Sequence, residues 1–167
     1  MKGPIVLIGP MGSGKTAVGD LLSKRMGWEF IDLDHLIEAR TGMDIDRYFR
    51  EHGERGFREL ESHILDENMG KEKAVISCGG GIVTTRRNLE ALQSMEGVVL
   101  LFADGKTLAE RLGSDSSRPL LQGHDKERRI NEILGQRKEL YLYAADIAID
   151  TAGKTIEEVV DIIIDFW

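Results

Sequence analysis

Gly-Pro-Met-Gly-Ser-Gly-Lys-Thr, residues 9–16, joins a short apolar run at residues 5–8 to a segment of helical period. The spacing G-x-x-x-x-G-K-[ST] between a strand and a helix is typical of a phosphate-binding P-loop. Glycines let successive backbone N–H groups face an anion, and the positive N-terminal end of the following helix adds to the attraction. The alternative is a strand–turn–helix junction that is rich in glycine by chance. Because both flanking segments have the required periods, we predict a nucleoside triphosphate site.

Two side chains of this loop suit a bound nucleotide. The ammonium of Lys15 can reach the β- and γ-phosphates, and the hydroxyl of Thr16 can ligate Mg²⁺. We expect ATP to contact the second half of the loop and the start of the helix: Gly12, Ser13, Gly14, Lys15, Thr16 and Ala17.

The composition favours one domain that acts on small molecules. A chain of 167 residues is long enough for a sizeable core, and no linker or repeat divides it, so we predict a single domain over residues 1–167. The net charge of −7 is unsuited to a nucleic-acid backbone. The chain has no apolar run long enough to span a membrane, no room for a signal peptide before the first strand, and a single cysteine, Cys78. We therefore expect a cytoplasmic monomer without nucleic-acid or membrane partners.

Short apolar runs alternate with segments of helical period along the chain. Strands are predicted at residues 5–8, 29–32, 74–77, 98–102 and 146–149. Helices are predicted to begin near Lys15, Leu36, Glu54, Arg86, Lys106, Lys126 and Thr155. This alternation predicts a three-layer α/β/α fold around a five-stranded parallel sheet, in which ligands bind beyond the carboxyl ends of the strands.

The last helix has clear local signals. Thr155 and Glu158 have the spacing of a capping box, in which each side chain bonds the free N–H of the other residue. An apolar stripe then follows at helical spacing: Ile156, Val159, Val160, Ile163 and Trp167. We assign this helix a structural role.

Asp32-Leu33-Asp34 follows the second predicted strand. In an extended segment alternate side chains share a side, so both carboxylates would face the nucleotide loop and Leu33 the core. One acid can hold Mg²⁺ directly or through water, and the other can orient a substrate hydroxyl or act as its base. The alternative is that one of them caps the next helix.

Two further features point to a second substrate. Arg58 lies beside the apolar stripe of its helix, where it can either form a plain ion pair with Glu61 or project into a cleft. Gly79, Gly80 and Gly81 follow the third strand. Three glycines in a row favour a loop that lies against a ligand over a tight turn.

Two arginines in the C-terminal half suit anionic ligands. Residues 112–124 contain Gly, Ser and Pro together with Arg118, which predicts a mobile lid over the phosphates; an ordinary surface loop is the alternative. Arg137 falls within the inward stripe of its helix, among Ile130, Ile133, Leu134 and Tyr141. An arginine on a buried face must meet an anion or extend to solvent, and its planar fork suits a carboxylate. Arg58 and Arg137 together indicate an anionic second substrate.

The joint pattern resembles the shikimate kinases of the P-loop kinase superfamily over nearly the whole chain. The motifs that carry the resemblance are, in order, G-P-M-G-S-G-K-T, D-L-D, F-R-E-L-E, G-G-G, R-P-L-L and R-K-E-L-Y. The resemblance implies a P-loop fold of the nucleoside-monophosphate-kinase type with a mobile lid. It also implies transfer of the γ-phosphoryl group of ATP to the 3-hydroxyl of shikimate, giving shikimate 3-phosphate and ADP in aromatic amino acid biosynthesis.

The resemblance further implies which residues bind shikimate. Arg58 and Arg137 match the arginines that meet the substrate carboxylate, and Asp34 matches the acid that holds the ring hydroxyls. Gly79 to Gly81 match the loop against the substrate. The implied substrate-binding helical segment spans about residues 34–62.

The nucleotide side is implied in the same way. Asp32 matches the acid that supports Mg²⁺ together with Thr16. Arg118 matches the lid arginine and Arg111 the residue whose guanidinium packs on adenine. The implied catalytic residues are Lys15, Asp34 and Arg118.

Three residues depart from the family pattern, but none removes a catalytic group. Ala17 and Asp20 stand where a hydroxyl residue and often a base are expected, and Cys78 stands where Thr or Ala is more usual. Cys78 is either reactive toward thiol reagents near the site or a buried small residue. The competing functions are another small P-loop kinase, acting on gluconate or a nucleoside monophosphate, and a non-catalytic nucleotide-binding regulatory domain.

Overall fold

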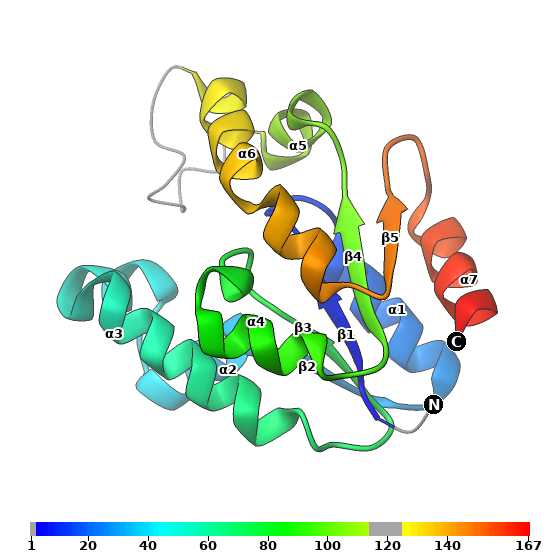
Figure 1. Cartoon of the computed structure of the whole chain (residues 1–167), viewed down its shortest axis with the longest axis horizontal. Helices are drawn as coiled ribbons and strands as arrows, with labels where there is room; N and C mark the ends of the chain where they lie inside the picture. Colours follow the sequence, from blue (N-terminus) through cyan, green and yellow to red (C-terminus); the bar gives the residue numbers. More distant parts are fainter. Residues whose placement is uncertain (1–2, 114–124) are drawn as a thin grey trace.

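A five-stranded parallel sheet forms the centre of the computed structural model, which describes residues 3–113 and 125–167 (Figure 1). The strand order is β2-β3-β1-β4-β5, and Val6 in the central strand pairs with Ile76 on one side and Val98 on the other. The predicted parallel α/β architecture is confirmed. The strands are β1 (Ile5–Ile8), β2 (Glu29–Asp32), β3 (Ala74–Ser77), β4 (Val98–Phe102) and β5 (Ile147–Asp150).

Helices cover both faces of the sheet, and α4 and α6 cross in front of the strands in Figure 1. The described helices are α1 (Lys15–Met26), α2 (Leu33–Thr41), α3 (Ile45–Asn68), α4 (Arg86–Gln93), α5 (Gly105–Leu112), α6 (Lys126–Ala144), α7 (Ile156–Phe166) and the short 3₁₀ helix η1 (Ile82–Thr84). None of these helices combines the length and the apolar character that a membrane crossing would need.

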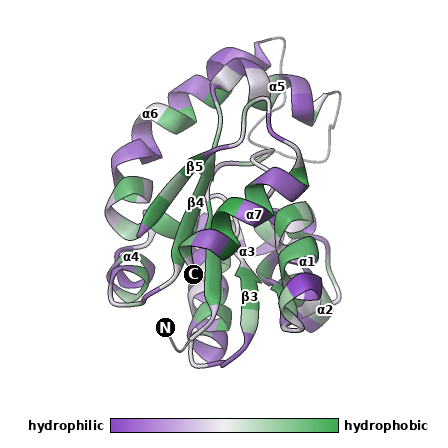
Figure 2. Cartoon of the chain, turned by 90° about the vertical axis from the view of Figure 1, so that its right-hand side faces the viewer, coloured by the Kyte–Doolittle hydropathy of each residue, from purple (hydrophilic) through white to green (hydrophobic). Residues whose placement is uncertain are grey.

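The alternation of side chains along β1 divides the core in two. Val6 and Ile8 pack with residues of α2, α3, α4 and α6, whereas Ile5 and Leu7 pack with residues of α1 and α7. All four β1 side chains are fully buried. Figure 2 shows β3, β4 and β5 as an apolar centre between helices whose outer faces are polar.

Four of the five strands have their predicted bounds, and the fifth begins one residue later than expected, at Ile147. Asp146 was predicted to open this strand. Its carboxylate instead accepts hydrogen bonds from the backbone N–H groups of Gly97 at 2.8 Å and Val98 at 2.9 Å. A pattern of apolar residues cannot predict that a carboxylate accepts hydrogen bonds from the backbone at the start of a neighbouring strand.

Two helix starts differ from the prediction. The second helix begins at Leu33 rather than near Leu36, because Asp32 caps it. The third begins at Ile45 instead of Glu54: Asp44 caps it, and Gly53, with φ +72°, separates its two halves. The prediction rested on the apolar stripe of the second half, although Ile45, Tyr48 and Phe49 in the first half also pack against the core.

The capping box of the last helix is confirmed: the Thr155 hydroxyl accepts from Glu158 N at 3.2 Å, and the Glu158 carboxylate accepts from Thr155 N at 2.7 Å. The stripe beyond it is shorter than predicted, since Ile156 is 41% exposed. The buried residues of α7 are Val159, Val160 and Ile163.

Candidate active site

The P-loop lies between β1 and α1, at the carboxyl end of the sheet. Gly9 has φ +141°, and a Cβ there would come within 2.0 Å of the Leu101 carbonyl oxygen on β4. The buried side chain of Lys15 turns back over the loop, and its Nζ donates to the carbonyl oxygens of Gly9 at 2.8 Å and Pro10 at 2.9 Å. An ammonium and the positive end of α1 therefore lie within one tight turn, which suits a phosphate group.

Asp32 caps the next helix, which was one of its two interpretations, and it also contacts Thr16. Its Oδ1 caps α2 by accepting from the backbone N–H groups of Asp34 at 3.0 Å and His35 at 3.3 Å. Its Oδ2 accepts from the Thr16 hydroxyl at 2.9 Å. Leu33 is buried as predicted, although it already belongs to the helix, so Asp34 lies in the first helical turn and not in an extended segment.

Thr16 and Asp32 have oxygen atoms that fit a nucleotide-bound Mg²⁺. Mg²⁺ takes few protein ligands and fills its remaining positions with water and phosphate oxygens. Within the described ranges no cluster of three or more His, Cys, Asp or Glu residues could hold a metal by protein ligands alone. A hydroxyl beside a single carboxylate next to the phosphate loop is the donor set expected for a metal that arrives with its nucleotide.

A pocket of about 580 Å³ adjoins the P-loop and is lined by α2, α3, the glycine loop and α6. It contains eight of the residues predicted from the sequence: Thr16, Asp32, Asp34, Arg58, Gly79, Gly80, Gly81 and Arg137. Ten further lining residues were not predicted as site residues: Met11, His35, Glu38, Asp44, Ile45, Asp46, Phe49, Arg50, Phe57 and Glu61. The pocket therefore joins the phosphate loop to both predicted arginines.

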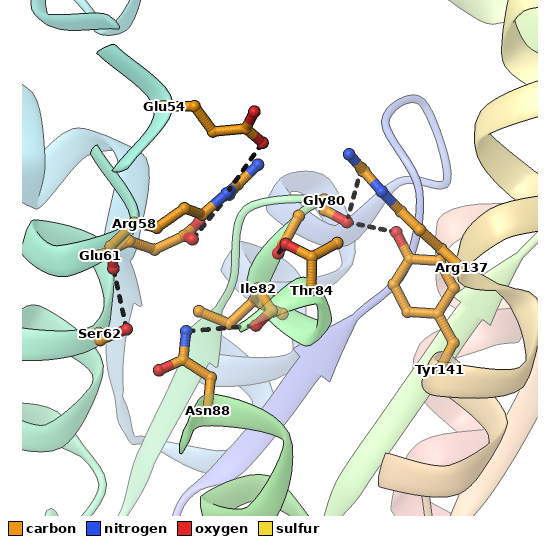
Figure 3. A network of polar contacts seen from close by, with 11 residues as sticks. Glu54, Arg58, Glu61, Ser62, Gly80, Ile82, Thr84, Asn88, Arg137 and Tyr141 are labelled. Atoms are coloured by element: carbon orange, nitrogen blue, oxygen red, sulfur yellow. Dashed lines mark hydrogen bonds and ion pairs between the residues drawn. The ribbon is translucent and has the colours of Figure 1, made fainter. Parts of the chain in front are cut away.

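Arg58 and Glu61 form a buried ion pair inside this pocket, so both interpretations of Arg58 hold at once. Arg58 Nη1 donates to Glu61 Oε2 at 2.7 Å (Figure 3). The guanidinium carbon lies 5.2 Å from the centre of the Phe57 ring. Glu61 is only 1% exposed. Burial raises the pKa of its carboxyl group, and the charge of Arg58 opposes this rise. Within the described residues, Arg58 Nε and Glu61 Oε1 have no hydrogen-bond partner.

The position of Glu61, one turn after Arg58, was the one sign in the sequence that the two residues form an ion pair. A surface pair at that spacing contributes little to stability, so the pairing alone did not identify Glu61 as a site residue. Its carboxylate lies against Gly79 of the glycine loop, which comes from a different part of the chain.

Two of the three glycines, Gly79 and Gly81, leave room for these site side chains. A Cβ at Gly79 would lie 2.8 Å from Glu61 Oε1 and 3.1 Å from Asp34 Oδ1, and a Cβ at Gly81 would lie 2.2 Å from Arg58 Nη2. None of the three has a positive φ. Gly79 and Gly81 are therefore favoured by the close approach of charged side chains, a reason that the sequence alone did not indicate, whereas a Cβ at Gly80 would meet only Met11 and Gly9 at 3.4 Å or more.

Arg137 approaches the same loop from α6, on the side opposite to Arg58 (Figure 3). Its Nη1 donates to the Gly80 carbonyl oxygen at 3.2 Å, and the Tyr141 hydroxyl donates to the same oxygen. Arg137 is half-buried, while Ile130 and Tyr141 on its helix are buried. The predicted inward stripe of α6 therefore does bring Arg137 to the pocket.

Arg111 lies at the end of α5, next to the P-loop. Its guanidinium donates to Thr151 Oγ1 at 2.8 Å, to the Thr151 carbonyl oxygen at 2.7 Å and to the Gly12 carbonyl oxygen at 3.3 Å. It thus ties the loop after β5 to the phosphate loop. Arg118, and residues 114–124 of the predicted lid, lie outside the described residues.

Cys78 lies at the end of β3, immediately before the glycine loop, and is 2% exposed. Burial raises the pKa of its thiol, and the nearby charge of Glu61 adds to this effect. A buried, protonated thiol is a poor nucleophile, so the structure favours the interpretation of Cys78 as a small core residue.

Comparison with known proteins gives a consistent result. The profile of the family described as "Shikimate kinase" matches residues 11–167. The shikimate kinase of Thermodesulfovibrio yellowstonii is 43% identical over 160 residues, which cover 96% of this chain and 92% of the relative. That of Moorella thermoacetica is 45% identical over 154 residues, covering 92% of this chain and 88% of the relative.

Solved structures agree with the sequence comparison. The shikimate kinase of Acinetobacter baumannii in complex with shikimate superposes with a TM-score of 0.94 at 36% identity, covering 98% of this chain and 92% of that one. A gluconokinase from Sinorhizobium meliloti superposes with a TM-score of 0.60 at 21% identity, covering 98% and 90%. The second similarity reflects a shared fold alone.

Proposed function

The chain belongs to the shikimate kinase family, and from this membership we propose that it transfers the γ-phosphoryl group of ATP to the 3-hydroxyl of shikimate, giving shikimate 3-phosphate and ADP. The observation that carries the substrate assignment is that Arg58 and Arg137 line the same pocket as Asp34 and the phosphate-loop residue Thr16. Two guanidinium groups in one pocket suit a small carboxylate, and an acid beside the phosphates suits its hydroxyl.

Each side of the pocket has a separate task in this proposal. Arg58 and Arg137 bind the shikimate carboxylate from the two sides of the glycine loop, and so fix the orientation of the ring. Asp34 accepts the hydrogen bond of the 3-hydroxyl and directs its oxygen toward the γ-phosphorus. The bond from this oxygen to phosphorus forms as the bond from phosphorus to the β,γ-bridging oxygen breaks, and ADP leaves. The hydroxyl proton passes to Asp34 or to solvent.

The nucleotide side supplies charge stabilisation. Lys15, now bonded to loop carbonyls, donates to the phosphates, and Arg111 contacts the adenine. Arg118, which lies outside the described residues, is assigned the role of stabilising the negative charge that develops during transfer. Thr16 and Asp32 hold Mg²⁺, which when bound neutralises phosphate charge. Protein groups act here by alignment and electrostatics, without a covalent intermediate.

The test is ADP release from Mg-ATP at neutral pH, with and without shikimate. We expect strong stimulation by shikimate and none by gluconate or nucleoside monophosphates at equal concentration. Faster turnover of gluconate would move the chain to a sibling kinase. Bound ATP without turnover of any of these acceptors would favour a regulatory domain. Because the proposed reaction needs Mg²⁺, addition of EDTA to the active mixture should abolish ADP release.

We also propose that the enzyme acts as a cytoplasmic monomer on small molecules, without nucleic-acid partners. The net charge of −7 and the single, buried cysteine support this. Light scattering coupled to size-exclusion chromatography tests the oligomeric state: a mass of twice 18.7 kDa would contradict a monomer.

A further inference from the structure

Tyr141 has no role in the proposed function, yet its hydroxyl reaches the wall of the substrate pocket. It donates a hydrogen bond to the Gly80 carbonyl oxygen, which also accepts from Arg137 Nη1 at 3.2 Å (Figure 3). Arg137 and Tyr141 are four residues apart on α6, so they project from the same face of that helix. One carbonyl of the glycine loop is therefore bonded by two side chains of α6.

We propose that Tyr141 is a positioning residue for shikimate: by fixing the Gly80 carbonyl, it fixes the direction in which Arg137 presents its guanidinium to the pocket. The inference rests on the proposed function, since it concerns the binding of the shikimate carboxylate. Tyr141 itself does not line the pocket and acts through Gly80 and Arg137.

The tyrosine is well suited to act as a fixed donor. Its side chain is 2% exposed and belongs to the main core cluster, so its ring cannot swing away from the loop. Burial raises the pKa of its hydroxyl group, which keeps the proton on the oxygen at physiological pH. The Gly80 carbonyl thus meets a neutral donor held by the core.

Gly80 also lies against the phosphate loop. A Cβ at this residue would lie 3.4 Å from the backbone nitrogen of Met11 and 3.6 Å from the Gly9 carbonyl oxygen. The glycine loop is therefore enclosed between the P-loop and α6. A hydrogen bond from Tyr141 to Gly80 restrains the distance between the arginine on α6 and the phosphates on the other side of the loop.

Arg137 depends on such a restraint more than Arg58 does. Arg58 is oriented by a charged partner, Glu61, at 2.7 Å, whereas Arg137 bonds a neutral carbonyl at 3.2 Å. A guanidinium has five N–H donors, so the bond to Gly80 leaves others for a carboxylate. A long side chain that is already oriented loses less conformational freedom when the ligand binds.

The test is Tyr141→Phe, which removes one hydroxyl and keeps the ring. We expect the KM for shikimate to rise about two- to tenfold, the range set by loss of one neutral hydrogen bond, with a smaller change in the KM for ATP. The matched control is Tyr143→Phe on the same helix, where the side chain is 56% exposed and the kinetics should not change. Thermal unfolding of both variants reports on the fold.

A double-mutant cycle separates positioning from a merely structural role. If Tyr141 acts through Arg137, then Tyr141→Phe should change the KM for shikimate less than about twofold when Arg137→Ala is already present. Effects that multiply fully would overturn the proposal, as would a lowered melting temperature with an unchanged KM. Either result would leave the wild-type enzyme active with shikimate, whereas failure of the proposed function would leave it without shikimate-dependent ADP release.

Discussion

Gly81→Ala tests whether the glycine loop makes room for Arg58, the arginine that we propose binds the shikimate carboxylate. A Cβ at residue 81 would lie 2.2 Å from Arg58 Nη2 and 2.5 Å from the guanidinium carbon. Non-bonded heavy atoms are most stable at about 3.5 Å or more, so the guanidinium has to move by roughly 1 Å. Such a move separates it from Glu61 Oε2, which it now contacts at 2.7 Å.

Two free-energy terms determine the size of the effect. A hydrogen bond to a charged group contributes about 1.5–3 kcal/mol. In the free protein the variant loses the bond between Arg58 and Glu61, and in the complex it loses the bond between Arg58 and the shikimate carboxylate. Replacing glycine stiffens the unfolded chain and returns about 0.4–1 kcal/mol of stability. We therefore expect the free energy of unfolding to fall by about 1–2 kcal/mol and kcat/KM for shikimate to fall about 10- to 100-fold.

The assay is shikimate-dependent ADP release over a range of shikimate concentrations, together with urea unfolding. Gly135→Ala on α6 is the matched control, because a Cβ there meets no atom within 4 Å. It should stabilise the protein by up to about 1 kcal/mol and leave the kinetics unchanged. A Gly81→Ala enzyme with the KM for shikimate and the stability of the wild type would refute the reasoning, since Arg58 would then not need its present position.

Three further predictions concern the charged and buried groups of the site. Asp34→Asn should lower kcat by about 10²–10⁴-fold while ATP still binds, and a kcat close to wild type would remove Asp34 from the mechanism. Because burial raises the pKa of Glu61 above its value in the unfolded chain, its contribution to stability is complete below the unfolded pKa and is lost as the pH rises through the folded pKa. The free energy of unfolding of the wild type, measured in urea relative to Glu61→Gln, should therefore decrease as the pH rises above the unfolded pKa of about 4.3, and an increase would contradict the raised pKa. The thiol of Cys78 should resist Ellman's reagent in the native protein and react in urea; rapid reaction of the native protein would indicate an accessible thiolate.

The sequence by itself determined the features that neighbouring residues encode. Four strands have their predicted bounds and the capping box of Thr155 and Glu158 is present, because period and capping depend on residues within one or two turns of each other. The P-loop prediction likewise depended only on residues close together in the sequence, at positions 9–16. Asp34, Arg58 and Arg137, which were singled out because they follow a predicted strand or lie on or beside an apolar stripe, do line one pocket; their roles in binding stay a prediction.

Only the tertiary structure decided how these residues act on one another. Glu61 is one turn from Arg58 in sequence, but it is buried in the fold, with Gly79 from another part of the chain so close that a Cβ there would lie 2.8 Å from Glu61 Oε1. Gly80 and Tyr141 are 61 residues apart, and no period or motif relates them. Desolvation and hydrogen-bond geometry are properties of the packed chain. The segments that the sheet brings together therefore decide whether an ion pair is buried and whether a core tyrosine can position another residue.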